Sequence, residues 1–200
     1  MLLPSIKSRP VYGTLAPRAG TAHLFVADAE GAEAILDLAG IASPDFFEKA
    51  QIFYVPTRGA VSDFETRLTA LRPHAYNASP SIAAMLPRLS QTLSTARMGL
   101  QLYLAGTEGL IGRATKVATD YGFHHDAIMT EHRGSTARRV QCVHCKGITE
   151  EVKTQPVICS HCGLRLLVRD HYSRRIAAFQ GVCIDAEQPG SAPPMQEMFP

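Results

Sequence analysis

Short apolar runs alternate with amphipathic stretches along the first two thirds of the chain. The runs have the length and composition of buried strands, and they fall at residues 23–27, 51–55, 100–105 and 127–130. Between them, apolar residues recur at helical spacing, which predicts helices over residues 32–39, 62–71, 81–98 and 110–121. Strands that alternate with helices favour right-handed crossovers, so the sequence predicts an α/β fold with an open, mostly parallel sheet.

Proline and glycine interrupt both ends of the chain. Residues 1–20 contain three prolines and two glycines, which predicts an extended N-terminal segment. Residues 187–200 contain four prolines and little apolar periodicity, which predicts a flexible tail. Between these ends we expect an α/β domain at residues 21–135 and a small cysteine-rich domain at residues 138–184.

Two Cys-x-x-Cys pairs, Cys142 with Cys145 and Cys159 with Cys162, are separated by 13 residues. This spacing allows two tight turns to direct four thiolates at one tetrahedral metal ion. We expect a compact zinc ribbon, because a closed four-cysteine zinc site is structural and leaves no position for a substrate. Two alternatives use the same residues: a rubredoxin-like iron site, which would carry an electron, and a pair of disulfides.

The apolar runs are too short for a membrane protein, since none approaches the roughly 18 to 20 residues needed to span a bilayer. Residues 1–10 also lack the pattern of a signal peptide. We therefore expect a cytoplasmic protein whose thiols stay reduced. The fifth cysteine, Cys183, is then expected to be a small buried apolar residue and not a reactive thiol.

Charge is spread unevenly over a chain whose formal net charge is only +2. Residues 133–175 contain nine Lys and Arg residues against three acids. A basic zinc ribbon suits nucleic acid or an acidic protein partner, and the acids interleaved with the arginines make the protein partner at least as good a match. Arg169, Arg174 and Arg175 are our candidate docking residues, with a solvated charged face as the alternative.

Three loops, residues 28–31, 56–59 and 105–109, would lie at the ligand-binding edge of the predicted sheet. They lack the glycine fingerprint of a dinucleotide site, and the first contains two acids that would repel a phosphate. His124 and His125 follow the last predicted helix, where solvated side chains are expected in preference to a second metal site. No nucleophile and base stand out as a pair, so no catalytic residue is predicted.

Three short segments resemble the pyridine-nucleotide domain of ferredoxin reductase-type flavoproteins, especially the phthalate dioxygenase reductase group. They are Ile-Phe-Tyr-Val-Pro-Thr-Arg at residues 52–58, Leu-Tyr-Leu-Ala-Gly at residues 102–106 and Gly-Phe at residues 122–123. The resemblance implies the fold of that domain. Two loops depart from it, because residues 27–32 replace a glycine-rich loop and residues 105–107 replace a Cys-Gly-Pro loop.

The C-terminal part is similar to a second family. The two cysteine pairs, Val-Arg-Asp-His-Tyr-Ser-Arg-Arg at residues 168–175 and Ala-Ala-Phe-Gln-Gly-Val at residues 177–182 resemble the DmmA-like subunits of bacterial dimethylamine monooxygenase. The resemblance covers most of the chain. It implies a place in a multi-subunit, haem-dependent oxygenase that uses NADPH and dioxygen to convert dimethylamine to methylamine and formaldehyde.

Together the residues and the resemblance predict an accessory subunit without catalytic residues, which assembles a haem-containing oxygenase subunit and a flavin and iron–sulfur reductase subunit. Haem, FMN and an iron–sulfur cluster are then expected on the partners, and zinc on this chain. Three alternatives remain from the residues alone: an iron electron carrier, a nucleotide-binding reductase component and a nucleic-acid-binding zinc ribbon.

Overall fold

The structure, a computed structural model, describes residues 8–57 and 63–200. They form two compact units, residues Tyr12–Gly134 and residues 8–11 with Ser135–Pro200. We call them the α/β unit and the cysteine unit. Each contains its own buried apolar core.

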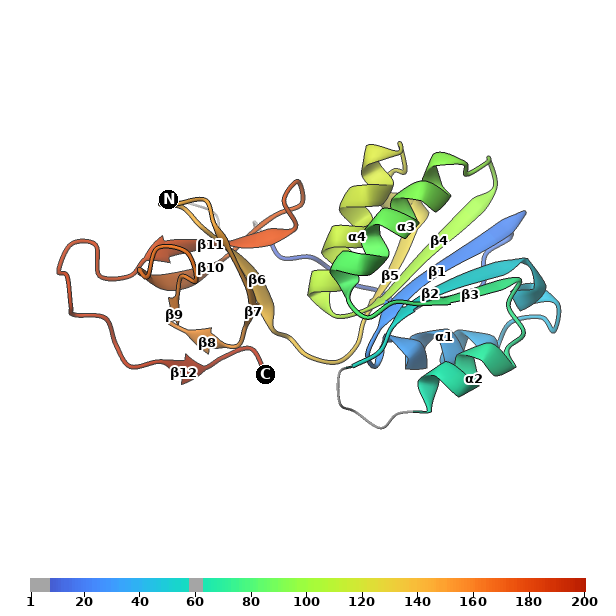
Figure 1. The fold of residues 1–200 in the computed structure, drawn as a ribbon, viewed down its shortest axis with the longest axis horizontal. Helices are drawn as coiled ribbons and strands as arrows, with labels where there is room; N and C mark the ends of the chain where they lie inside the picture. Colours follow the sequence, from blue (N-terminus) through green and yellow to red (C-terminus); the bar gives the residue numbers. More distant parts are fainter. Residues whose placement is uncertain (1–7, 58–62) are drawn as a thin grey trace. The chain divides into compact units, whose positions relative to one another are not determined.

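The α/β unit is built on a five-stranded sheet with the strand order β3-β2-β1-β4-β5, in which all neighbours run parallel (Figure 1). Its strands are β1 (Ala22–Asp28), β2 (Ala50–Val55), β3 (Ala75–Ala78), β4 (Leu100–Gly106) and β5 (Ile128–His132). The predicted α/β class with a parallel sheet is therefore confirmed. The edge strand β3 was not predicted, because its residues are only partly buried and it has no continuous apolar run.

Helices cover both faces of this sheet (Figure 1). They are α1 (Gly31–Ala39), η1 (Phe46–Lys49), α2 (Phe64–Ala70), α3 (Ile82–Ser94), α4 (Glu108–Asp120) and η2 (His125–Ala127). Alternate residues of β1 point to opposite faces: Phe25 packs in the core with α1 and α2, and Leu24 in the core with α3 and α4. The predicted start of the second helix at Ser62 lies outside the described residues.

The segment that precedes β1 is hydrogen-bonded to the edge strand β5 and to its neighbour β4. The N–H of Gly13 donates to the carbonyl of Thr130 at 2.8 Å, and the N–H of Leu15 donates to a carboxylate oxygen of Glu131 at 2.7 Å. Further along, the N–H of Arg18 donates to the hydroxyl of Tyr103 at 3.1 Å. Residues 13–18 of the predicted extended segment are thus held by hydrogen bonds from three of their backbone N–H groups.

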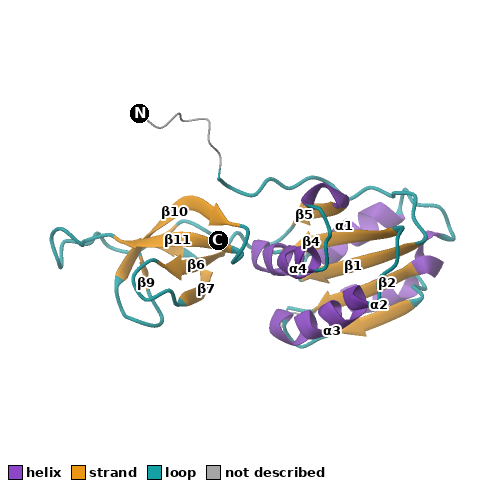
Figure 2. Cartoon of the chain, turned by 90° about the horizontal axis from the view of Figure 1, so that it is seen from above, coloured by secondary structure: helices purple, strands orange, loops and turns teal. Residues whose placement is uncertain are grey.

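The cysteine unit contains a five-stranded sheet with the order β7-β6-β11-β10-β9, parallel only between β6 and β11 (Figure 2). Its strands are β6 (Arg138–Cys142), β7 (Ile148–Val152), β9 (Val157–Ile158), β10 (Arg165–Ser173) and β11 (Ala178–Cys183). A second, two-stranded sheet pairs β8 (Thr154–Gln155) with β12 (Gln196–Glu197). A register shift in β10 between Arg169 and Tyr172 marks a bulge that contains Asp170.

The end of the chain is anchored by one buried side chain, although most of residues 187–200, which were predicted to form a flexible tail, are exposed. Phe199 is buried, and its N–H donates to the carbonyl of Lys153 at 2.9 Å. The guanidinium of Arg138 lies 4.1 Å from the ring centroid of Phe199 and equally far from that of Phe179, so it is held between two aromatic rings. The amino-acid composition predicted disorder here, because one aromatic residue hardly changes the mean hydropathy of a proline-rich segment.

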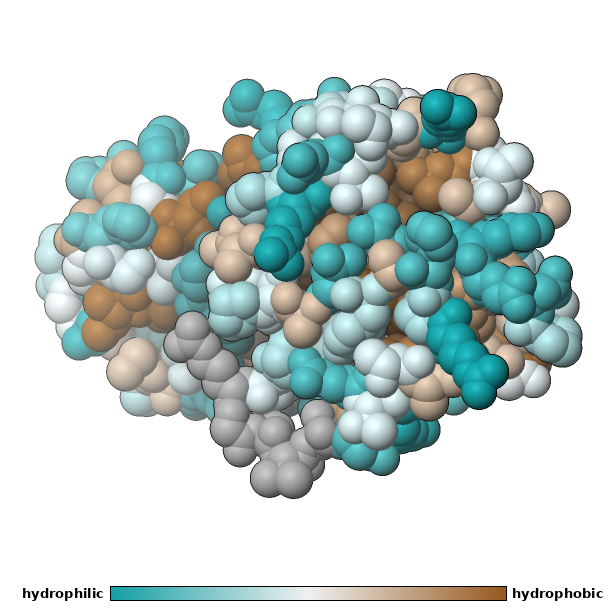
Figure 3. Space-filling view, turned by 45° about the vertical axis from the view of Figure 1, so that its right-hand side comes forward, coloured by the Kyte–Doolittle hydropathy of each residue, from teal (hydrophilic) through white to brown (hydrophobic). Residues whose placement is uncertain are grey.

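Exposed apolar side chains are scattered over the surface, and hydrophilic residues are interspersed with apolar ones on the face drawn in Figure 3. The most exposed large ones are Val11, Ile41, Met98 and Met195. Apolar residues that are exposed singly need no partner to cover them. Within the described ranges, no helix combines the length and the hydropathy required to cross a bilayer.

We predict that Phe199→Ala lowers the free energy of unfolding of the cysteine unit by about 3 kcal/mol, because it removes buried aromatic area and one face of the Arg138 sandwich. Urea titration followed by circular dichroism measures this change. Met198→Ala is the matched control, since Met198 is 53% exposed and its removal should change stability by less than about 0.5 kcal/mol. Equal effects of the two substitutions would show that the tail is not anchored through Phe199.

A second prediction concerns Asp170, which pairs with Arg9 and, at 3.0 Å, with Arg138. The hydrogen bonds from Arg9 and Arg138 lower the pKa of the Asp170 carboxyl. Its contribution to stability is therefore present at neutral pH and lost as the pH falls through that lowered pKa. Asp170→Asn should destabilise the protein at pH 7, and urea titrations at decreasing pH should show the gap to the wild type closing. A gap that stays constant down to about pH 3 would contradict this assignment.

A candidate metal centre formed by two cysteine turns

The first cysteine turn, residues 142–147, joins β6 to β7. The N–H of Cys142 donates to the carbonyl of Gly147 at 2.9 Å, and the N–H of Lys146 donates to the carbonyl of Cys142 at 3.0 Å. Lys146 has a left-handed backbone with φ of 62°. The N–H of Gly147 lies 3.4 Å from the sulfur of Cys145.

The second cysteine turn, residues 159–164, joins β9 to β10 and repeats the first residue for residue. The N–H of Cys159 donates to the carbonyl of Leu164 at 2.8 Å, and the N–H of Gly163 donates to the carbonyl of Cys159 at 3.0 Å. Gly163 has φ of 74°, and a Cβ atom there would have open space around it. Glycine is therefore favoured here by the backbone conformation and is not required by close packing. The two turns therefore present their thiols in equivalent ways.

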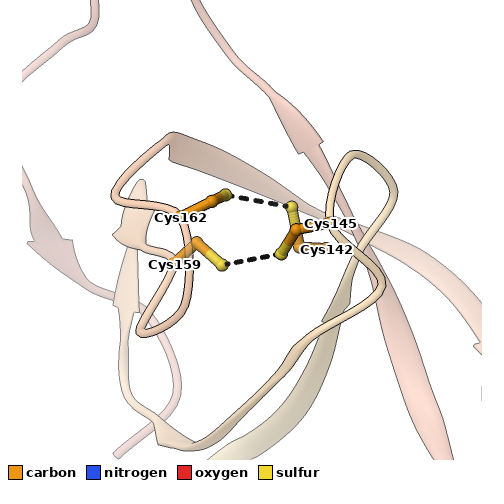
Figure 4. A group of neighbouring side chains, drawn as sticks. All are labelled: Cys142, Cys145, Cys159 and Cys162. Atoms are coloured by element: carbon orange, nitrogen blue, oxygen red, sulfur yellow. Dashed lines mark hydrogen bonds between the residues drawn. The ribbon is translucent and has the colours of Figure 1, made fainter.

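The four sulfurs of the two turns converge on one point (Figure 4). The sulfurs of Cys142 and Cys162 are 3.8 Å apart, those of Cys145 and Cys159 are 3.7 Å apart, and all four lie within 4.8 Å of one another. An ion with bonds of about 2.3 Å to four tetrahedral sulfurs requires sulfur–sulfur distances of about 3.8 Å. All five cysteines are free thiols, so the four residues could hold a metal ion.

Burial, backbone N–H groups and neighbouring thiols shift the pKa values of two of these cysteines in opposite directions. Burial raises the pKa of Cys159, but hydrogen bonds from the N–H groups of Cys162 and His161 and from neighbouring thiols outweigh it and lower that pKa to about 6. For Cys162 the N–H of Leu164 lowers the pKa, but burial and the neighbouring thiols raise it to about 12. One negative charge is thus favoured in the cluster and further ones are resisted, a balance that a cation would reverse.

His161 and Thr149 tie the second cysteine turn to the first. The Nε2 atom of His161 lies 2.9 Å from the carbonyl oxygen of Ile148, and its ring covers Gly147 so closely that a side chain there would lie 2.4 Å from it. The Thr149 hydroxyl accepts a hydrogen bond from the N–H of Ser160 at 3.1 Å. Apart from these contacts with Ile148 and Gly147, His161 is exposed to solvent.

The remaining candidate residues lie away from the four sulfurs. His124 and His125 are exposed side chains of the α/β unit, and the one cluster of potential metal ligands among the described residues does not include them. Cys183 is half-buried, with its sulfur 3.4 Å from a carboxylate oxygen of Asp185. Arg169 is an exposed residue of β10, and the exposed Arg174 and Arg175 belong to the turn between β10 and β11.

In the α/β unit, the carboxyl ends of β1 and β4 meet where the strand order reverses, the usual position of a nucleotide in such sheets. The buried carboxylate of Asp28 lies there and accepts hydrogen bonds from the N–H of Thr107 at 2.8 Å and from its hydroxyl at 2.6 Å. Gly106 has φ of 126°, and a side chain there would lie 1.9 Å from this carboxylate. A phosphate at this place would meet the repulsion predicted for residues 28–31. Of the loop at residues 56–59, Arg58 and Gly59 lie outside the described residues.

We predict that Cys159→Ser reduces the metal content of the purified chain from about one ion to near zero and lowers the unfolding midpoint of the cysteine unit, because three thiolates close the site poorly. Elemental analysis by mass spectrometry and urea titration measure the two effects. Cys183→Ser is the matched control and should retain the ion. Metal loss in both variants, or in neither, would contradict a centre made of these four sulfurs.

Comparison with known proteins finds a curated relative and solved structures that are similar to parts of this chain. The delta subunit of a haem-dependent oxidative N-demethylase from Ectopseudomonas mendocina (strain ymp) is 38% identical over 110 residues, 55% of this chain and 63% of the relative. The match thus spans less than two thirds of that relative. A ferredoxin reductase of carbazole 1,9a-dioxygenase, in its FAD apo form, gives a TM-score of 0.42 at 15% identity, covering 58% of this chain and 34% of that structure.

Both parts of the chain match one family. Residues 4–128 match the N-terminal domain and residues 139–182 match the C-terminal domain of the DmmA-like subunit of dimethylamine monooxygenase. The second range contains all four cysteines of the candidate metal centre, and the first contains Asp28 and Thr107. The chain belongs to the DmmA-like family of dimethylamine monooxygenase subunits.

Proposed function

We propose that this chain is an accessory subunit of a haem-dependent oxidative N-demethylase that uses NADPH and dioxygen to convert dimethylamine to methylamine and formaldehyde. In this role it holds zinc at Cys142, Cys145, Cys159 and Cys162 and assembles the haem-containing oxygenase subunit with the flavin and iron–sulfur reductase subunit. Haem, FMN and the iron–sulfur cluster belong to these partners. The complex is a cytoplasmic hetero-oligomer.

The observation that carries the proposal is the closed arrangement of the four sulfurs. Their separations of 3.7 and 3.8 Å match a tetrahedral ion that is fully surrounded by thiolates. Such an ion stabilises the fold of a small unit and has no open position for substrate or oxygen. A chain that holds its metal in this way contributes structure to the complex, and the redox steps take place on other subunits.

The buried Asp28 supports the same division of labour. Its carboxylate occupies the edge of the sheet where a pyridine nucleotide would place its phosphates, and both of its oxygens are hydrogen-bonded to Thr107. A carboxylate about 4 Å from a phosphate charge costs on the order of 4 kcal/mol at an effective dielectric of 20. NADPH therefore binds to the reductase partner, and the α/β unit serves as a rigid scaffold.

Docking uses the basic side of the cysteine unit. Arg169, Arg174 and Arg175 are exposed, and none of the ion pairs among the described residues involves them. Unpaired guanidinium groups bind the carboxylates of a partner with two parallel hydrogen bonds each. These three arginines are the proposed contact to the partner subunits.

A second candidate function uses the same sulfurs with a different ion. Four thiolates in a tetrahedron also suit iron, and an iron form would carry one electron between the reductase and the oxygenase. The two ions differ in colour, because iron thiolate sites absorb visible light and zinc sites do not. The same preparation therefore tests both functions.

Co-expression with the oxygenase and reductase subunits tests the proposal. We expect one complex on size-exclusion chromatography that contains about one zinc per copy of this chain, with visible absorbance from the partners' cofactors alone. Omission of this chain should lower NADPH-dependent demethylation of dimethylamine by more than about tenfold, since the partners are no longer held together. Failure of the chain to join the complex, or turnover by the purified chain alone, would overturn the proposal. A red isolated chain that contains iron would favour the electron carrier.

A further inference from the structure

A small hollow of about 210 Å³ opens in the cysteine unit between the first cysteine turn and the β10–β11 hairpin. Lys146 from the cysteine turn, His171 from the bulge in β10 and Arg175 from the hairpin turn line it. Gln141 and Gln180, which are opposite each other on the paired strands β6 and β11, also contribute to the lining. The hollow therefore has basic groups from three separate segments and two amide side chains from neighbouring strands.

Among residues 8–57 and 63–200, no acidic side chain lines this hollow. Among the described residues, the ion pairs of this unit involve Arg9, Arg138 and Arg139, and none includes Lys146, His171 or Arg175. The ammonium of Lys146 donates one hydrogen bond to the carbonyl of Val143 at 2.7 Å, which leaves two of its N–H groups for a ligand. The acid adjacent to His171, Asp170, is already engaged with Arg9 and Arg138. The positive charge of the hollow is thus uncompensated.

The backbone that carries these groups is fixed. The guanidinium of Arg139 donates hydrogen bonds to the carbonyls of Ile176 and Ala177 in the hairpin turn, and its Nε donates to Glu150 at 2.8 Å. On the other side, Lys146 lies between Cys145 and Gly147 in a turn that the candidate metal centre closes. A preorganised backbone loses little entropy when a ligand binds.

We propose that this hollow binds the carboxylates of an acidic, extended segment of a partner subunit, with Lys146 and Arg175 as the charged contacts and the two glutamines as hydrogen-bond partners of its peptide groups. The inference rests on the proposed function and narrows it, because Arg175 lines the hollow whereas Arg169 and Arg174 do not. A protein segment fits this small hollow better than nucleic acid does, because a nucleic-acid strand needs a groove that follows several successive phosphates. The metal centre gains a second role, which is to hold Lys146 in place.

The test compares two double charge reversals in the full-length chain. Lys146→Glu/Arg175→Glu changes the hollow, and Arg169→Glu/Arg174→Glu makes the same change of charge outside it. The affinity of each purified chain for the oxygenase and reductase subunits is measured by biolayer interferometry at two salt concentrations. We expect the hollow variant to bind at least about tenfold more weakly than the outside variant, and the wild type to lose affinity at high salt. Zinc content and circular dichroism confirm that both variants are folded.

The outcomes separate this inference from the proposed function. Equal losses of affinity in the two variants, or no loss of affinity in the hollow variant, would show that the hollow is not the docking site. The proposed role as an accessory subunit would then still stand. Absence of binding by the wild-type chain overturns both. Binding of a single-stranded oligonucleotide that is lost in the hollow variant would assign the hollow to nucleic acid and overturn the acidic segment.

Discussion

The cysteine unit depends on one constraint, which is that two turns far apart in its sheet must bring four sulfurs to a common point. Its buried apolar cluster is small and includes Cys142 and Cys159 themselves. A unit of this size gains little stability from burial alone, so an ion held by the four sulfurs would add the stability that the small core does not supply. The matching hydrogen bonds of the two turns show how the backbone meets that constraint.

The α/β unit follows different physics. Its parallel sheet is covered on both faces and is packed in two buried apolar clusters, so burial of apolar side chains is the main source of its stability. The edge that holds a ligand in many such sheets is instead internally satisfied, since Asp28 and Thr107 close it with two short hydrogen bonds.

Periodicity predicted most of the α/β unit, because buried strands and amphipathic helices each leave a clear pattern. It missed β3, whose half-exposed residues have no such pattern. Cysteine spacing predicted which sulfurs meet, but not that Lys146 takes the left-handed position that glycine takes at residue 163. That choice, like the packing of His161 over Gly147 and of Phe199 on Arg138, depends on contacts between distant segments that local sequence does not encode.

The four sulfurs differ in their access to solvent. Cys142 and Cys159 are buried, Cys162 is partly covered, and Cys145 is exposed. Oxidants and chelators reach a thiolate cluster through its most accessible member. Cys145 is therefore the member of the cluster that oxidants reach most easily. Oxidation of Cys145 would disrupt the first cysteine turn before the buried Cys142 and Cys159 are affected.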